Sequence, residues 1–125
     1  MSHKGRIQLT IIFTATPDMV EEGDRIWGSH AAWMEKSHYR DGNKALLIYN
    51  LSRGPELSNP VDPSSKPTGN MNYVLTEVYE TQAGVEDHWK QGSENWKDFP
   101  ALVKWAGKCK VTALPAGGPV VHSLW

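Results

Sequence analysis

Two different periods of hydrophobicity alternate along the chain, and their order is the feature that most restricts its fold. Four segments show the two-residue alternation, or the short apolar run, that is typical of β-strands: residues 6–16, 44–53, 72–80 and 108–114. After the first and the third of these segments, apolar residues recur at the three- and four-residue steps of an α-helix. The sequence therefore predicts the order β-α-β-β-α-β.

This order is the split-βαβ, or ferredoxin-like, arrangement. We predict an α+β fold in which two helices cover one face of a four-stranded antiparallel sheet. The opposite face is also expected to be apolar, with side chains from three strands: Ile12, Leu46 or Ile48, Val74 and Val78. A second copy of the sheet is the simplest cover for such a face, so we expect a homodimer.

Local signals mark the ends of the helices. Thr16 is expected to cap the first helix, with Pro17 in its first turn. Thr81 is expected to cap the second helix. Gly92 and Pro100 should bend this second helix or break it into shorter segments.

Residues 1–125 are predicted to form a single domain, because the chain is too short for two cores of ordinary size. Residues 54–72 contain four of the eight prolines and almost no periodicity. We therefore predict a long loop there that is either mobile or reaches over a partner subunit. Residues 115–125 are predicted to form a turn followed by an edge strand or a tail that clasps the dimer.

Composition excludes several classes of partner. The 13 basic and 14 acidic side chains leave a formal net charge of −1, which provides no attraction for nucleic acid or an anionic membrane. No segment reaches the ~20 apolar residues of a membrane span, and no signal peptide is predicted at the N-terminus. The single cysteine, Cys109, excludes an internal disulfide. We therefore expect a cytoplasmic protein.

The segment from Asn72 to Trp89 resembles the signature of the antibiotic-biosynthesis monooxygenase domain family. In that family, a strand with the pattern aromatic-apolar-apolar-x-Glu-Val-Tyr precedes a helix that carries Ala-x-x-x-x-His. Four residues of this chain match the pattern: Glu77, Tyr79, Ala83 and His88. The resemblance implies a dimeric α+β barrel, in agreement with the predicted order of elements.

The resemblance also implies a reaction. Quinol and anthrone oxygenases of the family use O₂ without a metal or a flavin, so we expect no cofactor and a small aromatic substrate. The haem-degrading relatives use an asparagine on the first strand and a histidine late in the second helix, and this chain has neither. The prediction is a cofactor-independent monooxygenase. The alternative is a non-catalytic dimeric module that binds a small hydrophobic molecule.

His88 and Glu77 are the first candidates for catalysis. His88 is predicted to face the sheet, and Glu77 lies eleven residues upstream on the preceding strand. A carboxylate beside the imidazole would fix its tautomer and raise its basicity, as a general base requires. The same pair would serve equally well as a structural hydrogen bond between strand and helix.

His30 is the third catalytic candidate, within the apolar stripe of the first helix and near Trp27 and Trp33. It is either a polar group in an aromatic-walled pocket between helix and sheet or a core histidine bonded to a neighbour. If His30 or His88 is the base, activity should fall as the pH drops through the histidine range near ~6.5, shifted by burial or by Glu77. His38, at the helix end, is expected to interact with the helix dipole.

Six tryptophans are more than a domain of this size needs for its core, and flat side chains suit a planar aromatic ligand. We predict four aromatic substrate-binding residues, with ordinary core packing as the alternative for each: Trp27, Trp33, Tyr79 and Trp96. Asn50 is a fifth candidate, because an amide within an apolar strand must find hydrogen-bond partners. No metal site is predicted, since the histidines show no close ligand pair such as H-x-x-x-H.

Overall fold

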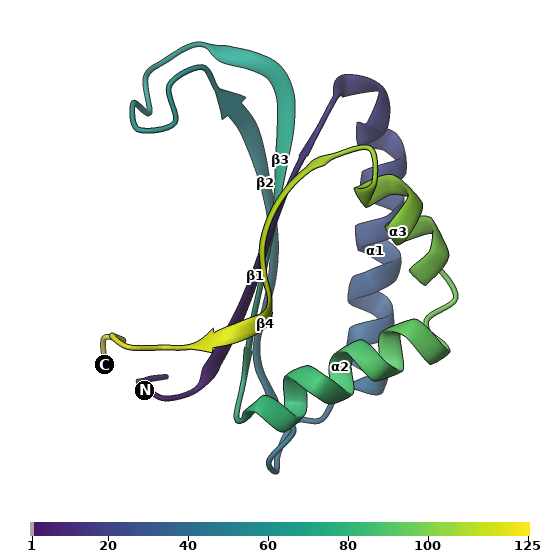
Figure 1. Ribbon diagram of the computed structural model, residues 1–125, viewed down its shortest axis with the longest axis vertical. Coiled ribbons are helices and arrows are strands. Elements are labelled where there is room, and N and C mark those ends of the chain that lie inside the picture. The colour runs from purple at the N-terminus through teal and green to yellow at the C-terminus, as the bar shows by residue number, and fades with distance from the viewer. Residues whose placement is uncertain (1) are drawn as a thin grey trace.

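The computed structural model describes residues 2–125, which form one antiparallel sheet and a layer of helices (Figure 1). The elements follow one another as β1 (Ile7–Ala15), a 3₁₀ turn η1 (Pro17–Met19), α1 (Val20–Ser37), β2 (Leu46–Leu57), β3 (Pro67–Tyr79), α2 (Gln82–Asn95), α3 (Phe99–Ala106) and β4 (Lys110–Pro119). The strands lie in the order β2-β3-β1-β4, and each neighbouring pair is antiparallel. All three helices cover the same face of the sheet (Figure 1). The predicted ferredoxin-like α+β fold is confirmed.

Successive side chains of β1 point to opposite faces of the sheet. Leu9, Ile11 and Phe13 are buried beneath the helices, and Ile12, between them in sequence, points to the opposite face and is half-buried. Ile12 pairs with Val74 of β3, which continues the outer face. Phase along a strand therefore decides which side chains can reach a site between the helices and the sheet.

The two helix starts differ in how they are capped. The Thr16 hydroxyl donates to the Asp18 carboxylate at 2.5 Å instead of capping backbone N–H groups, and Pro17 begins a 3₁₀ turn. The predicted capping by Thr16 is therefore wrong. Thr81 does cap α2, because its hydroxyl accepts from the backbone N–H of Ala83 at 3.2 Å.

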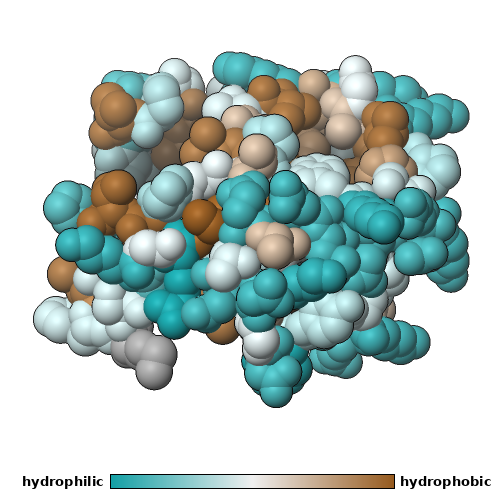
Figure 2. Space-filling view, turned by 60° about the horizontal axis from the view of Figure 1, so that its bottom comes forward, coloured by the Kyte–Doolittle hydropathy of each residue, from teal (hydrophilic) through white to brown (hydrophobic). Residues whose placement is uncertain are grey.

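The second helical segment is divided as predicted. α2 ends at Asn95, and α3 begins at Phe99 with Pro100 in its first turn, where the missing N–H of proline costs nothing. Gly92 stays within α2 and does not break it. The polar side of α2 faces outward, and the face of the molecule in Figure 2 is largely hydrophilic, with its hydrophobic side chains in small separate groups.

Trp105 of α3 fills the core between α1 and the sheet. Its indole N–H donates to the Met19 carbonyl at 2.9 Å, and its ring packs against Phe13 and Tyr73, with centroids 5.4 and 5.2 Å apart. Gly23 of α1 permits this contact, because a Cβ atom there would lie 2.7 Å from the Trp105 ring. This end of the helical layer is closely packed, so the space for a ligand lies elsewhere.

The prediction of a long loop over residues 54–72 is wrong at both of its ends. β2 continues to Leu57 and β3 begins at Pro67, so only residues 58–66 connect the strands. β2 is an edge strand, where a proline is tolerated because the N–H that it lacks has no ladder partner to lose. The register also shifts between Pro55 and Leu57. The two strands bend away from the helices as a long hairpin (Figure 1).

The C-terminal segment contains more strand than predicted. β4 runs through the expected turn to Pro119 and pairs with β1, with a register shift between Gln8 and Thr10. Gly117 has a φ of +74°, and a Cβ atom there would lie 2.6 Å from Ile7, so only glycine fits. Residues 120–125 lie outside β4, although Val120 still forms backbone hydrogen bonds with Gly5 and Arg6 at 2.9 and 2.8 Å. No helix within residues 2–125 is both long and apolar enough to cross a membrane.

Candidate functional site

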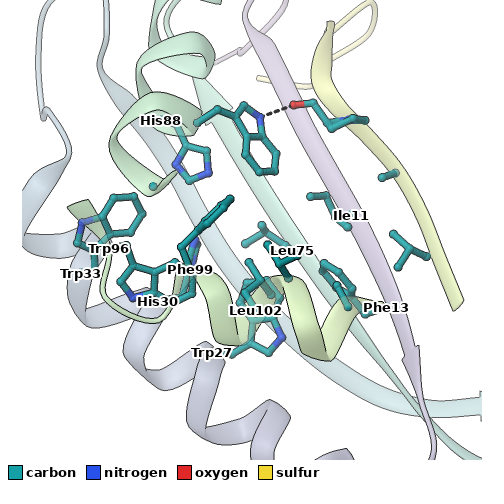
Figure 3. Close-up of a pocket in the computed structure, with 17 residues that line it drawn as sticks. Ile11, Phe13, Trp27, His30, Trp33, Leu75, His88, Trp96, Phe99 and Leu102 are labelled. Atoms are coloured by element: carbon teal, nitrogen blue, oxygen red, sulfur yellow. Dashed lines mark hydrogen bonds between the residues drawn. The ribbon is translucent and has the colours of Figure 1, made fainter. Parts of the chain in front are cut away.

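A cavity of about 330 Å³ lies between the inner face of the sheet and the three helices (Figure 3). Most of its lining is aromatic or aliphatic: Ile11, Phe13, Trp27, Trp33, Leu75, Trp89, Trp96, Phe99 and Leu102 are examples. His30 of α1 and His88 of α2 are the ionisable side chains among the lining residues. A cavity with this lining suits a small, flat and largely apolar molecule.

The cavity opens between α3 and β4. Val103 and Val111 line it and are 56% and 45% exposed, so they mark its mouth. Nearer to α2, the indole N–H of Trp89 donates to the Pro115 carbonyl at 2.7 Å, the bond drawn in Figure 3. This bond ties α2 to β4 beside the mouth.

Tryptophans build the wall between α1 and α2. The Trp33 and Trp96 rings stack with centroids 5.7 Å apart and an interplanar angle of 19°. Trp96 is held from behind, because its indole N–H donates to the Ser29 hydroxyl at 3.1 Å. The indole nitrogen of Trp27 is buried with no hydrogen-bond partner within residues 2–125. The wall presents ring faces and edges to a ligand.

His30 lies beside the tryptophans and is only 3% exposed. Its Nδ1 atom is 2.8 Å from the hydroxyl of Tyr49 on β2. Burial lowers the pKa of His30 to about 3, and the nearby His38 adds to this effect. His30 is therefore neutral at physiological pH, while burial raises the pKa of Tyr49 and keeps its phenol protonated.

His88 lies next to His30 in the cavity wall, with ring centroids 5.9 Å apart and the rings nearly perpendicular. Burial lowers the pKa of His88 to about 3, and His30 and His38 contribute in the same direction. Its Nδ1 atom lies 3.7 Å from the nearer carboxylate oxygen of Glu77, which is too far for a hydrogen bond. The expectation that Glu77 raises the basicity of His88 is therefore wrong, because burial dominates the pKa of His88.

Glu77 is completely buried beneath the two histidines. The Tyr79 hydroxyl donates to its Oε1 atom at 2.5 Å, whereas Oε2 has no partner within residues 2–125. Burial raises the pKa of Glu77 to about 7, although the hydrogen bond from Tyr79 opposes this shift. The carboxyl group therefore binds its proton more strongly than an exposed glutamate does and lies next to the base candidates.

His38 belongs to the same cluster of polar side chains as His30, His88 and Glu77. Its position in the sequence did not indicate this. Its backbone N–H closes α1 by donating to the Met34 carbonyl at 3.1 Å, but its side chain points to His88, with Nε2 and the Nδ1 of His88 2.9 Å apart. Burial lowers the pKa of His38 to about 4, so it carries no charge for the helix dipole to attract. The predicted electrostatic interaction with the helix end is wrong.

Three side chains of the cluster carry atoms that could act together as metal ligands. Within residues 2–125, His30, Glu77 and His88 each offer one such atom, and these atoms lie within 4.8 Å of one another. Two nitrogens and one carboxylate oxygen suit a first-row transition metal. The residues come from α1, β3 and α2. The sequence predicted the pair of Glu77 and His88 and the inward direction of His30, but it contains no close ligand pair that would have indicated a metal site.

The structure brings together most, but not all, of the predicted site residues. Trp27, Trp33 and Trp96 line the cavity with His30 and His88. Glu77 and Tyr79 lie behind the histidines and do not line it. Their roles, like those of the lining residues, remain predictions.

Asn50 lies on the opposite face of the sheet. It pairs with Thr76 and is exposed, whereas its neighbours Tyr49 and Leu51 point toward the helices. A register shift between Leu46 and Ile48 sets this phase. The prediction that Asn50 contacts a ligand beside the other candidates is therefore wrong for this cavity.

Fold and cavity together define a ferredoxin-like α+β domain with a ligand-sized, histidine-bearing pocket under its helices. The same fold occurs in a solved structure from Deinococcus radiodurans that is described as a "putative antibiotic biosynthesis monooxygenase". The two chains are 18% identical, with a TM-score of 0.52 over 93% of this chain and 97% of the other. The predicted resemblance in fold is thus confirmed. No protein-family model matches the sequence, and neither does any curated protein.

Proposed function

We propose that the protein is a cofactor-independent monooxygenase that oxidises a small quinol- or anthrone-like substrate with O₂. The observation that carries this proposal is the pair of neutral histidines, His30 and His88, in an otherwise apolar cavity walled by tryptophans. Such a cavity can orient a flat aromatic molecule, exclude water and still offer it a base.

The proposed reaction begins with removal of a proton from the substrate by a neutral imidazole. His88 and His30 are weak bases in the empty cavity, because burial disfavours their charged forms. The anion that forms on the substrate supplies the missing opposite charge and stabilises the imidazolium. The electron-rich anion then reduces O₂. For an anthrone, one oxygen atom replaces the two hydrogens of the CH₂ group as a carbonyl, and the other leaves as water.

Oxygen consumption tests this proposal. With anthrone as substrate, we expect the protein to consume one O₂ per molecule oxidised, without added flavin or metal and at a rate unaffected by a chelator. Heat-denatured protein gives the rate of spontaneous oxidation. Quenching of tryptophan fluorescence, measured in parallel, shows whether the ligand binds.

The two measurements separate the two function classes. Quenching without oxygen consumption would indicate a non-catalytic module that binds a small hydrophobic molecule. Oxygen consumption that disappears with a chelator and returns with one metal ion would instead assign His30, Glu77 and His88 to a metal site. Either result would contradict the proposed cofactor-independent reaction.

We also propose that two copies of the chain associate through the sheet face that the helices leave uncovered. Ile12 and Val74 are paired near the middle of this face and remain half-buried, and Leu114 of β4, opposite Thr10, is 58% exposed. Apolar side chains that are only partly covered by their own subunit favour a protein partner. A second copy offers the same surface in a symmetric contact.

Light scattering tests the dimer. We expect twice the monomer mass of 14.0 kDa at micromolar concentration. Ile12→Lys should give a monomer, because it places a charge in the centre of the proposed contact. Ala31→Lys, on the exposed side of α1, is the matched control and should leave the mass unchanged. A wild-type mass near 14 kDa would disprove the association.

A further inference from the structure

Three side chains form a hydrogen-bonded chain that leads from the end of α1 into the cavity. The Ser37 hydroxyl is 2.7 Å from the Trp33 carbonyl and 2.9 Å from the Nδ1 atom of His38. The Nε2 atom of His38 is 2.9 Å from the Nδ1 atom of His88. Nothing in the proposed reaction has so far used Ser37 or His38.

The direction of every bond in this chain follows from its first member. A carbonyl oxygen can only accept, so the Ser37 hydroxyl donates its hydrogen to Trp33. The Ser37 oxygen must then accept from the Nδ1–H of His38. A neutral imidazole carries a single N–H, so Nε2 of His38 has no hydrogen and accepts from the Nδ1–H of His88.

The other nitrogen of His88, Nε2, is left without a hydrogen. With its one hydrogen on Nδ1, Nε2 carries a free lone pair. This atom makes no hydrogen bond within residues 2–125 and is not fully buried. Because His88 lines the cavity and is otherwise buried, the exposed part of this atom faces the ligand space (Figure 3).

We propose that Ser37 and His38 are positioning residues that hold His88 in one tautomer, so that its Nε2 atom accepts a hydrogen bond from an aromatic ligand that carries a hydroxyl group. The ligand class rests on the proposed function, whereas the tautomer rests on the hydrogen bonds alone. With the other tautomer, His88 would present an N–H to the cavity. That arrangement would favour ketones and ethers over phenols.

NMR of protein labelled with ¹⁵N-histidine tests the tautomer without any turnover. In the ligand-free protein, we expect His88 to carry its hydrogen on Nδ1 and to have an unprotonated Nε2. The His88→Gln variant identifies its signals. A hydrogen on Nε2 of His88 would overturn the proposal.

Binding of two matched probes tests the ligand class. We expect the wild-type protein to bind 1-naphthol about ten- to a hundredfold more tightly than 1-methoxynaphthalene, measured by tryptophan quenching, because the ether cannot donate to Nε2. Equal affinities would overturn the proposal. Failure of anthrone oxidation, with the tautomer and this preference intact, would contradict the catalytic function only.

Substitutions in the hydrogen-bonded chain of Ser37 and His38 distinguish a positioning role from a role in packing. His38→Phe should abolish the preference for the phenol, whereas His38→Gln should retain it, because the amide oxygen can accept from Nδ1–H of His88. Ser37→Ala should weaken the preference and allow His88 to sample both tautomers in the ¹⁵N spectrum. Ser93→Ala is the matched control, since its hydroxyl also donates to a helix carbonyl, that of Lys90, but meets no histidine. If His38→Phe and Ser37→Ala both keep the tautomer of His88 and the preference for 1-naphthol, Ser37 and His38 have no positioning role.

Discussion

Replacement of His88 by glutamine is expected to slow oxygen consumption with anthrone by about 10²–10⁴-fold, the usual effect of losing a general base. Glutamine has a similar reach and can form hydrogen bonds, but it cannot take up a proton. Binding of the aromatic ligand should change much less, because the tryptophan walls remain. The effect should therefore appear mainly in kcat.

The same change at His30 distinguishes the two base candidates. His30→Gln should reduce the rate less than His88→Gln does, because a hydrogen bond donated by the Tyr49 hydroxyl to Nδ1 of His30 would leave the single hydrogen of this imidazole on Nε2, without a free lone pair for the substrate. His122→Gln, in the exposed C-terminal tail, is the control. Circular dichroism and light scattering should first establish that each variant is folded and associated like the parent. Parental rates in both folded variants would show that the two histidines are structural.

Acid is expected to destabilise the protein steeply between about pH 6.5 and pH 4. His30 and His88 have folded-state pKa values of about 3, below the ordinary value of 6.5. The unfolded chain therefore binds more protons than the folded protein in this range, and stability falls as the pH drops. For either histidine the loss by pH 4 is on the order of 3 kcal/mol, a large part of the ~5–15 kcal/mol of a typical domain.

Glu77 has the opposite effect on the pH dependence of stability. Its pKa is raised from 4.5 to about 7, so the folded protein binds the extra proton and stability falls as the pH rises between these values. Urea unfolding at pH 5 and pH 8 separates the contributions. His88→Gln should reduce the loss in acid, and Glu77→Gln should stabilise the protein by about 3 kcal/mol at pH 8 but little at pH 5. A wild-type stability that is flat between pH 4 and pH 6.5 would contradict the assignment of buried neutral histidines.

The low pKa values also change the expected pH dependence of activity. The sequence suggested a fall in rate near pH 6.5, the ordinary histidine pKa. With both imidazoles neutral down to about pH 3 to 4, protonation of the free site cannot cause such a fall. A decline near pH 7 would point to Glu77.

Regular periodicity made much of the architecture predictable. The alternation of β1 and the stripe of α1 correctly placed Ile11, Phe13, Trp27 and His30 on inner faces, because a period of 2 or 3.6 fixes direction over a whole element. The position of His88 on the inner side of its helix followed in the same way. These predictions needed no knowledge of tertiary contacts.

The predictions that were wrong depended on contacts between distant elements. Prolines at 55 and 67 suggested a loop, but Pro55 lies on an edge strand and Pro67 is the first residue of its strand, and both positions tolerate proline. One register shift in β2 decided that Asn50 points away from the cavity. The basicity of His88 depended on burial rather than on its nearness to Glu77. The role of His38 depended on a partner fifty residues away.

The position of the cavity mouth has a consequence for how two subunits would work together. Val103 and Val111 open it between α3 and β4, and the cavity lies on the helical side of the sheet, opposite the face proposed to associate. Each subunit of a dimer would thus admit its own ligand without disturbing the contact between them. Saturation should then follow a simple hyperbola with a Hill coefficient of about 1, since each cavity is lined by residues of a single subunit.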